Sequence, residues 1–381
     1  MGNRESGRES SEQMKGKPTS AFGERLRLAR ALHGMTQRAL GDVVSAGQDM
    51  ISRVERGDLQ PSESLKAALA HALGFKLEFF DRPLTDEYRL AECSFRHLQS
   101  TPRRDLDRAM ALGTLFQEVV IGVRELVELP ANNLPSLPFD SEDAAERAAN
   151  EARLHWGLGL RAPIVNMMRV AENAGVLVAR LPGASRKVDA FSRPGSPPVV
   201  VLTSTKDSPV RERHDVAHEL GHLTGHQGRE TGDLRTERQA NRFASAFLLP
   251  ADGFAAEFRM LGGLDWPNLF ELKRRWKVAG PTMLSRAEQL GLIDPVNARR
   301  LYKQHSWKGW NRVEPFDVPA EEPELLTEAL RIAEQDTGHD LRMIAAELGW
   351  LPPAAGDVVG LPLKALAPRV AANVKRIEDY R

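Results

Sequence analysis

Apolar residues between positions 22 and 80 recur at helical spacing in four short stretches that glycines separate. Thr36 and Ser62 stand just before the second and fourth stretches, where their side-chain oxygens would cap a helix N-terminus. Gly57 and Gly74 follow the third and fourth stretches and are typical helix stops. The pattern therefore predicts four compact helices that form one small all-α domain.

Further along the chain, the apolar pattern predicts mostly helices with one short stretch of mixed structure. A Pro- and Asn-rich segment at 129–140 separates a long helical stretch from the next helix. Two short runs of Val and Leu in the region 163–205 indicate strands, and helical spacing returns from 210 to 300. The expected elements are helices over 105–128, 141–153, 165–173, 323–336, 340–348 and 364–378, and strands over 176–181 and 199–202.

These elements indicate a multidomain protein that is mainly α with a small α+β part. The length of 381 residues agrees with two or three domains. Residues 1–20 are polar and have the composition of a disordered arm.

Composition and charge exclude several classes of protein. Lys and Arg number 52, as do Asp and Glu, which excludes a globally basic nucleic-acid coat but not a basic face on one domain. The single cysteine, Cys93, excludes an internal disulfide, a zinc finger and an iron–sulfur cluster. The sequence has no run of about 18 apolar residues and no apolar N-terminal stretch. We therefore expect a cytoplasmic protein without a membrane partner.

The segment TQRALGDVVSAGQDMISRVERGDLQPS, residues 36–62, resembles the Xre/Cro-type helix-turn-helix family. The resemblance implies that residues 21–82 bind double-stranded operator DNA. The matching positions are Thr36-Gln37, Leu40, Ile51-Ser52, Glu55-Arg56-Gly57 and Pro61-Ser62.

The third predicted helix would enter the major groove, which requires polar side chains on its outer face and apolar side chains on its inner face. The resemblance also implies a phosphate contact by Gln37 at the start of the second helix. The outward candidates are Gln48, Asp49, Ser52 and Arg53, and the inward ones are Met50, Ile51 and Val54.

The charge of this region leaves two alternatives open. Residues 1–80 hold 12 Lys or Arg and 10 Asp or Glu, so their net charge is +2 and attraction to phosphates is modest. Asp49 would repel phosphate unless it reads a cytosine amine. The region is either an interaction module that does not touch DNA or a DNA-binding domain that gains affinity as a homodimer or through its weakly basic N-terminal arm. The motif favours the second alternative.

The sequence His218-Glu219-Leu220-Gly221-His222 is an H-E-x-x-H motif. Residues four apart on a helix lie about 40° apart and one turn along, so both imidazoles converge on one ion. Glu219 is rotated by about 100°, which suits a general base rather than a ligand. Glu237 lies 15 residues after His222 in the first turn of another predicted helix. Two His and one Glu are a ligand set of catalytic zinc sites.

The combined pattern HELGH, E-x-x-A-N-x-F-A and LLP looks like the ImmA/IrrE family of metallopeptidases. The resemblance implies that His218, His222 and Glu237 bind Zn²⁺ and that Glu219 is the general base. Asn241 belongs to the same pattern and is a candidate to support a ligand. His226 lies one turn further along the motif helix, where it either supports the site or is a surface histidine.

Together the two resemblances predict a fusion with a zincin-like α+β peptidase domain, which has a short sheet, and a mostly helical C-terminal region. The expected divisions are a disordered arm at 1–20, the helix-turn-helix domain at 21–82, a helical linker at 83–140, the peptidase domain at 141–300 and a helical region of unknown role at 301–381.

Two hypotheses about function follow. In the first, a DNA-binding transcriptional regulator carries a zinc-dependent endopeptidase. That endopeptidase cleaves a partner repressor, or the protein regulates its own operon, in a stress, mobile-element or toxin–antitoxin circuit. In the second, a non-catalytic Xre-family regulator or antitoxin uses the peptidase fold as a sensor or as a module that binds a protein such as a toxin. The intact pair of Glu219 and Glu237 favours the first, because a scaffold needs no general base.

Overall fold

The structure is a computed structural model, and the predicted arm at 1–20 and the predicted helix at 364–378 lie outside the residues that it describes. The described segments are 21–84, 87–89, 93–95, 101–181, 189–203, 208–229 and 231–359.

The predicted all-α domain is present, and it contains one more helix than the four expected. Thr36 caps the second helix by accepting the N–H of Ala39, and Ser62 caps the fourth by accepting the N–H of Leu65. Gly74 ends the fourth helix in the left-handed conformation, with φ of 75°. The helices are α1 (Ala21–Leu32), α2 (Gln37–Val43), α3 (Gln48–Glu55), α4 (Glu63–Leu73) and α5 (Leu77–Asp81).

A small mixed sheet forms the middle of the molecule, with strand order β1-β3-β4-β2. Strands β2 and β4 are parallel, whereas β3 pairs antiparallel with both β4 and β1. The sequence pattern indicates only β2 and β4, because Ser and Arg interrupt the apolar run of β3 and because β1 has two residues. The strands are β1 (Ser94–Phe95), β2 (Leu177–Arg180), β3 (Ala190–Arg193) and β4 (Val199–Leu202).

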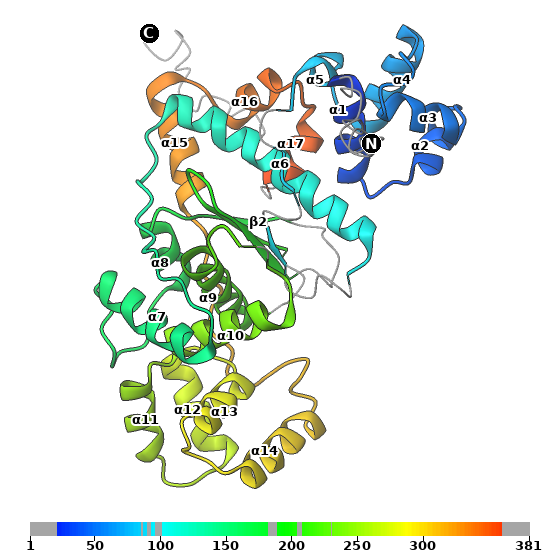
Figure 1. The fold of residues 1–381 in the computed structure, drawn as a ribbon. Coiled ribbons are helices and arrows are strands. Elements are labelled where there is room, and N and C mark those ends of the chain that lie inside the picture. The colour runs from blue at the N-terminus through cyan, green and yellow to red at the C-terminus, as the bar shows by residue number, and fades with distance from the viewer. Residues whose placement is uncertain are drawn as a thin grey trace, which may run out of the picture.

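The two faces of this sheet belong to two different buried clusters. Val178 and Val200 point to the cluster that contains the H-E-x-x-H helix, α9 (Pro209–Gly225). Leu177 and Val201 point to the opposite cluster, which contains the long helix α6 (Arg103–Leu126). This alternation is the period of two that a strand buried on both faces requires. Figure 1 shows α6 on one side of the sheet and α9 on the other.

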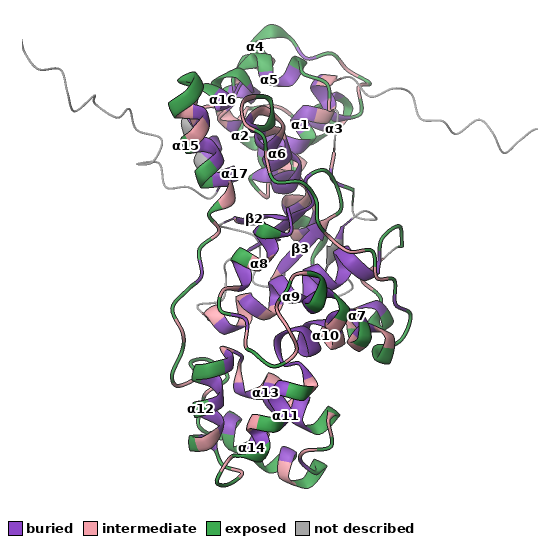
Figure 2. Cartoon of the chain, turned by 90° about the vertical axis from the view of Figure 1, so that its left-hand side faces the viewer, coloured by how far each residue is buried: buried purple, intermediate pink, exposed green. Residues whose placement is uncertain are grey.

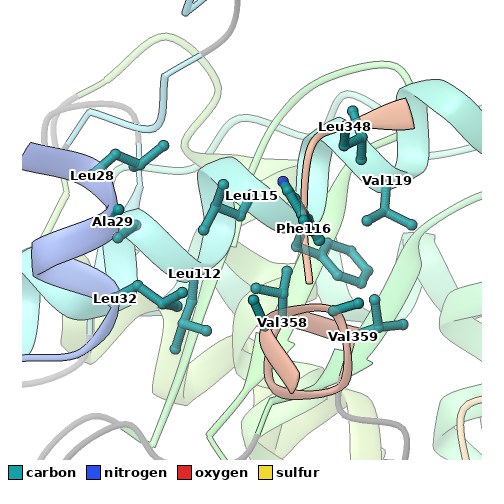
Figure 3. Close-up of a cluster of buried hydrophobic side chains, with 14 of the residues drawn as sticks. Leu28, Ala29, Leu32, Leu112, Leu115, Phe116, Val119, Leu348, Val358 and Val359 are labelled. Carbon is teal, nitrogen blue, oxygen red and sulfur yellow. The ribbon is translucent and has the colours of Figure 1, made fainter. Parts of the chain in front are cut away.

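Helix α6 joins three parts of the chain into one core. Its buried face contacts α1 of the helix-turn-helix domain and the C-terminal helices α15 (Leu325–Thr337), α16 (Leu341–Glu347) and α17 (Pro352–Val359). The predicted linker therefore contains a central structural element, and the divisions drawn through it stay a prediction. Figure 3 shows the shared contact, made by Leu28, Ala29 and Leu32 of α1, Leu112, Leu115, Phe116 and Val119 of α6, and Leu348, Val358 and Val359.

The C-terminal segment also pairs with the backbone of the helix-turn-helix domain. Trp350 forms an antiparallel bridge with Phe75, and the N–H of Lys76 donates to the carbonyl of Gly349 at 2.8 Å. Residues more than 270 positions apart in the sequence are thus neighbours.

Of the remaining helices, α7, α8 and α10 pack against the motif helix α9. The others extend the molecule away from the helix-turn-helix domain. Figure 2 shows α11 to α14 at the opposite end of the elongated molecule from α1 to α5. No described helix is long and apolar enough to cross a membrane. These helices are α7 (Glu142–His155), α8 (Met167–Asn173), α10 (Leu234–Leu248), α11 (Ala251–Arg259), α12 (Trp266–Trp276), α13 (Gly280–Gln289) and α14 (Pro295–Trp307).

Candidate metal centre and DNA-binding surface

Helices α9 and α10 form the candidate metal centre because they approach each other closely. A Cβ atom at Gly221, inside the motif, would lie 3.0 Å from the ring of Phe243 on α10, so only glycine fits this approach without displacing that ring. Asp233 caps α10 by accepting the N–H groups of Arg235 and Thr236. The cap fixes the first turn of α10, and Glu237 projects from that turn toward α9.

Three potential ligand atoms meet between these helices. The Nε2 atoms of His218 and His222 are 3.1 Å apart. Each Nε2 atom lies 3.3 Å from one carboxylate oxygen of Glu237. Ligands around a tetrahedral zinc ion at 2.0–2.1 Å are about 3.3–3.4 Å from one another. The three side chains therefore already have the spacing that a zinc ion requires.

Hydrogen bonds on the far side of each imidazole determine which ring nitrogen faces the cluster. His218 Nδ1 donates to Asn241 Oδ1 at 3.2 Å, which leaves a lone pair on Nε2. His222 Nδ1 lies 2.9 Å from His226 Nδ1, and His226 Nε2 lies 3.0 Å from Gln239 Oε1. If His226 donates to Gln239, its Nδ1 accepts from His222, and His222 Nε2 also carries a lone pair. Such partners orient metal-ligating histidines.

His226 has the protonation state that this chain of hydrogen bonds requires. Burial, together with the neighbouring His222, lowers the pKa of His226 to about 4. The ring is therefore neutral at pH 7, with one donor and one acceptor nitrogen. The structure thus places His226 inside the site and not on the surface.

The donor set itself fits a cation. Two imidazole lone pairs and a carboxylate face one another in a buried space, which is a repulsive arrangement unless a positive charge lies between them. Both oxygens of Glu237 are buried and, within the described residues, accept no hydrogen bond of good geometry.

Glu219 lies beside this cluster and has a different partner. Ser192 on β3 donates its hydroxyl hydrogen to Glu219 Oε2 at 2.6 Å, and both residues are buried. This hydrogen bond orients the carboxylate and connects the motif helix to the sheet. Sequence reasoning missed Ser192 because a lone serine in a short strand carries no motif signal. It also missed Gln239, although its position two residues after Glu237 places it on the same helix.

A cleft of about 690 Å³ opens next to the centre, between α9, α10 and the α13–α14 region. Asn241, which holds His218, forms part of its lining, as do His214 and Asp215 of α9. The cleft therefore reaches the centre through Asn241, the residue that holds His218, while the three candidate ligands do not line it.

The candidate DNA contacts lie on one exposed part of the helix-turn-helix domain. Gln48, Asp49 and Arg53 are exposed on α3, and Ser52 is half-buried. Gln37 is half-buried, and its side-chain amide donates to Glu55 at 2.7 Å, so an internal contact holds it at the start of α2.

The prediction that Met50 of α3 points toward the core is wrong. Ile51 and Val54 are fully buried as expected, but Met50 is 41% exposed. Met50 lies one residue before Ile51 and three after Gly47, so the helical rotation of about 100° per residue turns it away from the core. An exposed thioether on this face suits contact with a thymine methyl group rather than with the core.

The fold adds basic side chains that a count over residues 1–80 omits. Arg89, Arg103 and Arg104 line a groove of about 910 Å³ that Gln37 and Gln48 also line. Arg103 pairs with Asp107, whereas within the described residues Arg89 and Arg104 have no ion pair. Glu87 and Asp107 line the same groove, so the three arginines and two carboxylates beyond position 80 add a net charge of +1 next to α3.

Comparison with known families agrees with both parts of this description. Residues 21–79 match the family of the helix-turn-helix domain, and residues 171–286 match the peptidase family of the IrrE N-terminal-like domain. The chain combines a helix-turn-helix domain with an IrrE-like peptidase domain. The comparison with curated proteins found no match.

These matches confirm the predicted fusion and the mainly α fold class with its small α+β part. The helix-turn-helix domain indicates a DNA-binding regulator, and the IrrE-like domain indicates a peptidase-like module with a metallopeptidase fold. All the residues of the candidate metal centre lie inside the second matched range.

Proposed function

We propose that this protein is a cytoplasmic transcriptional regulator that binds operator DNA and hydrolyses peptide bonds with a zinc ion held by His218, His222 and Glu237. The observation that carries the proposal is the preformed cluster of three side chains. The two Nε2 atoms are 3.1 Å apart, His218 Nε2 lies 3.3 Å from Oε2 of Glu237, and His222 Nε2 lies 3.3 Å from Oε1. Glu219 follows His218 on the same helix and contacts Ser192 instead.

Each residue then has a definite task. A zinc ion, when bound, supplies a Lewis acid that activates water and polarises a carbonyl. Glu219 takes the proton from the attacking water and delivers it to the leaving amine. Ser192 orients Glu219 for this transfer, while Asn241 and His226, with Gln239, keep the ligand nitrogens deprotonated toward the ion.

Because the peptidase is fused to a DNA-binding domain, we propose that its substrate is a protein that acts at, or is expressed from, the promoter that the regulator binds. A partner repressor and a toxin are examples. We place the protein in a stress, mobile-element or toxin–antitoxin circuit for that reason. In the alternative, the protein is a non-catalytic regulator or antitoxin that uses the peptidase fold to sense a ligand or bind a partner. That alternative assigns no role to Glu219. The buried hydrogen bond between Ser192 and Glu219 therefore favours hydrolysis.

Metal removal tests this proposal directly. We expect the purified chain to bind about one zinc per polypeptide and to cleave unfolded, fluorescence-quenched casein in single-turnover reactions. A chelator should abolish cleavage, and added Zn²⁺ should restore it. Zinc content is measured by mass spectrometry of the metal, and cleavage by fluorescence and gel electrophoresis. Cleavage that survives complete removal of the metal would contradict the proposal.

We propose that the protein binds DNA as a homodimer. The proposed contacts with DNA are Gln37, Gln48, Asp49, Ser52 and Arg53. Substitutions at this surface should have two different effects. Gln48→Ala should weaken specific binding by about 1–3 kcal/mol, because a base-edge contact is lost. Arg104→Ala should weaken specific and non-specific binding alike and reduce the salt slope by about 1. Fluorescence anisotropy with the chain's own promoter and with random DNA, at several salt concentrations, separates the two effects.

Arg312→Ala is the matched control, since Arg312 is exposed near the C-terminal end of α14, at the other end of the molecule. Binding that ignores salt, and that Gln48→Ala and Arg104→Ala weaken no more than Arg312→Ala does, would show that this domain does not dock on DNA through α3.

A further inference from the structure

Strand β3 runs next to Glu219, the candidate general base. Ser192, in the middle region of β3, donates to Glu219 at 2.6 Å, so the adjoining backbone is within a side chain's length of the general base. Any extended chain that pairs with β3 at Ser192 is therefore held next to Glu219. Pairing with a sheet edge is a common way for proteins to bind an extended peptide.

The two edges of β3 have different partners. One edge pairs with β4, which continues the sheet toward β2 and the core. The other edge pairs with β1, where Ser94 lies opposite Ser192 and Phe95 lies opposite Phe191. A peptide that paired with this edge of β3 would have to take the place of β1.

We propose that the outer edge of β3 is the site that binds the extended segment of a protein substrate, and that the chain's own residues Cys93–Phe95 occupy this site at rest. The inference rests on the proposed peptidase function and adds the mode of substrate binding and its internal competitor. The geometry that carries it is the pairing of Ser94 with Ser192, a residue of β3 whose side chain donates to Glu219.

A residue shortly before this competitor, Tyr88, packs on the other face of the sheet. The Tyr88 ring contacts the Phe191 ring edge to face, with centroids 6.4 Å apart, and the Arg193 guanidinium lies 4.4 Å above the Tyr88 ring. A Cβ at Gly113 of α6 would lie 2.4 Å from the Tyr88 ring, so this glycine makes room for the anchor. Cys93 is itself buried. The chain is thus attached to α6 and β3 five residues before Cys93.

The pairing itself is short enough for a substrate to replace it. Residues of an antiparallel pair alternate between hydrogen-bonded and non-hydrogen-bonded positions, so two residues supply one hydrogen-bonded pair. A longer substrate strand would form more of these bonds along β3 and would displace β1 by competition.

The test uses the zinc-loaded full chain with Glu219→Gln, which prevents cleavage, and a fluorescein-labelled peptide RLAECSFRHLQ that copies residues 89–99. Ser94→Pro/Phe95→Pro removes both backbone N–H donors of β1. It therefore breaks the pairing whether the hydrogen bonds join Ser94 to Ser192 or Phe95 to Phe191. Ser94→Ala/Phe95→Ala keeps these donors and is the matched control. Fluorescence anisotropy should show at least tenfold tighter peptide binding to the proline variant than to the alanine variant. A scrambled peptide should bind neither.

A second variant covers the case in which the proline variant fails to fold, as judged by circular dichroism and promoter binding. Ser94→Cys/Ser192→Cys, with Cys93→Ser, places two thiols on directly opposite residues, at a distance that a disulfide spans. Oxidation should abolish peptide binding, and reduction should restore it. Equal binding before and after reduction, or equal binding to the proline and alanine variants, would overturn the inference.

Casein cleavage by the same variants with Glu219 restored separates this inference from the proposed function. The proline variant should cleave at least tenfold faster than the alanine variant. Tighter peptide binding without cleavage in any variant would support the binding site and reject the peptidase. Cleavage at one common rate, with no difference in peptide binding, would support the peptidase and reject the competitor.

Discussion

Glu219→Gln will slow casein cleavage by about 10²–10⁴-fold while the zinc content stays at that of the unmodified chain. The range is the usual contribution of a positioned general base. The amide keeps the size of the carboxylate and still accepts the hydrogen bond of Ser192, but it does not take a proton from water. The ligands His218, His222 and Glu237 are unchanged, so metal binding has no reason to weaken.

The measurement is a single-turnover cleavage rate together with the zinc content of the same sample. Glu212→Gln is the matched control, because Glu212 lies in the first turn of the same helix and pairs with Arg180 instead. It should retain the cleavage rate to within a few fold. A Glu219→Gln protein that holds zinc and cleaves at the original rate would show that the base is elsewhere or that no hydrolysis depends on this site.

Glu321→Ala will reduce the free energy of unfolding by about 3–5 kcal/mol, the usual cost of leaving one buried charge without its partner. Glu321 pairs with Arg213 of α9, whose side chain is 1% exposed, and the same carboxylate accepts the N–H of Met167 at 2.6 Å. Burial lowers the pKa of Arg213, and Glu321 opposes that shift by stabilising the charged guanidinium. Without Glu321, the buried Arg213 guanidinium keeps only the neutral carbonyls of Ile164 and Lys277, and the N-terminus of α8 loses the acceptor of the Met167 N–H.

Urea denaturation followed by circular dichroism measures this loss, and the neighbouring Glu322 provides the control. Glu322 also forms an ion pair, with Arg180, but its side chain is 64% exposed. Glu322→Ala should therefore cost less than about 1 kcal/mol. Similar losses for the two variants would mean that burial of the Arg213 pair is not what stabilises the attachment of the C-terminal segment to α9.

The local signals of the sequence predicted much of this structure correctly. Thr36, Ser62 and Gly74 mark helix ends through contacts within three or four residues, and such contacts depend on nearby sequence alone. The spacing of His218 and His222 predicts a shared ligand position for the same reason, because one helical turn separates them. Glu237 lies on another helix, so the sequence offers it only as a candidate third ligand, and its position 3.3 Å from both histidines depends on how α9 and α10 pack.

Contacts between distant segments explain what the sequence left unpredicted. Ser192 reaches Glu219 only because β3 packs on α9, and Gln239 matters only through the neighbouring His226. Met50 was assigned to the core from its apolar character, whereas its direction depends on how α3 packs against α1 and α2. An apolar side chain at a binding surface looks the same in sequence as one in a core.

By itself, the sequence of this protein predicted most of its helices, its two clearest strands and the spacing of His218, Glu219 and His222 on one helix, because each depends on the regular geometry of a single element. The tertiary structure alone decided that α6 is a shared core element, that Trp350 pairs beside Phe75, and that Ser94 lies opposite Ser192 next to the candidate base. These outcomes result from burying apolar faces that come from distant parts of the chain. Such burial does not depend on sequence separation, so no local pattern records which faces will meet.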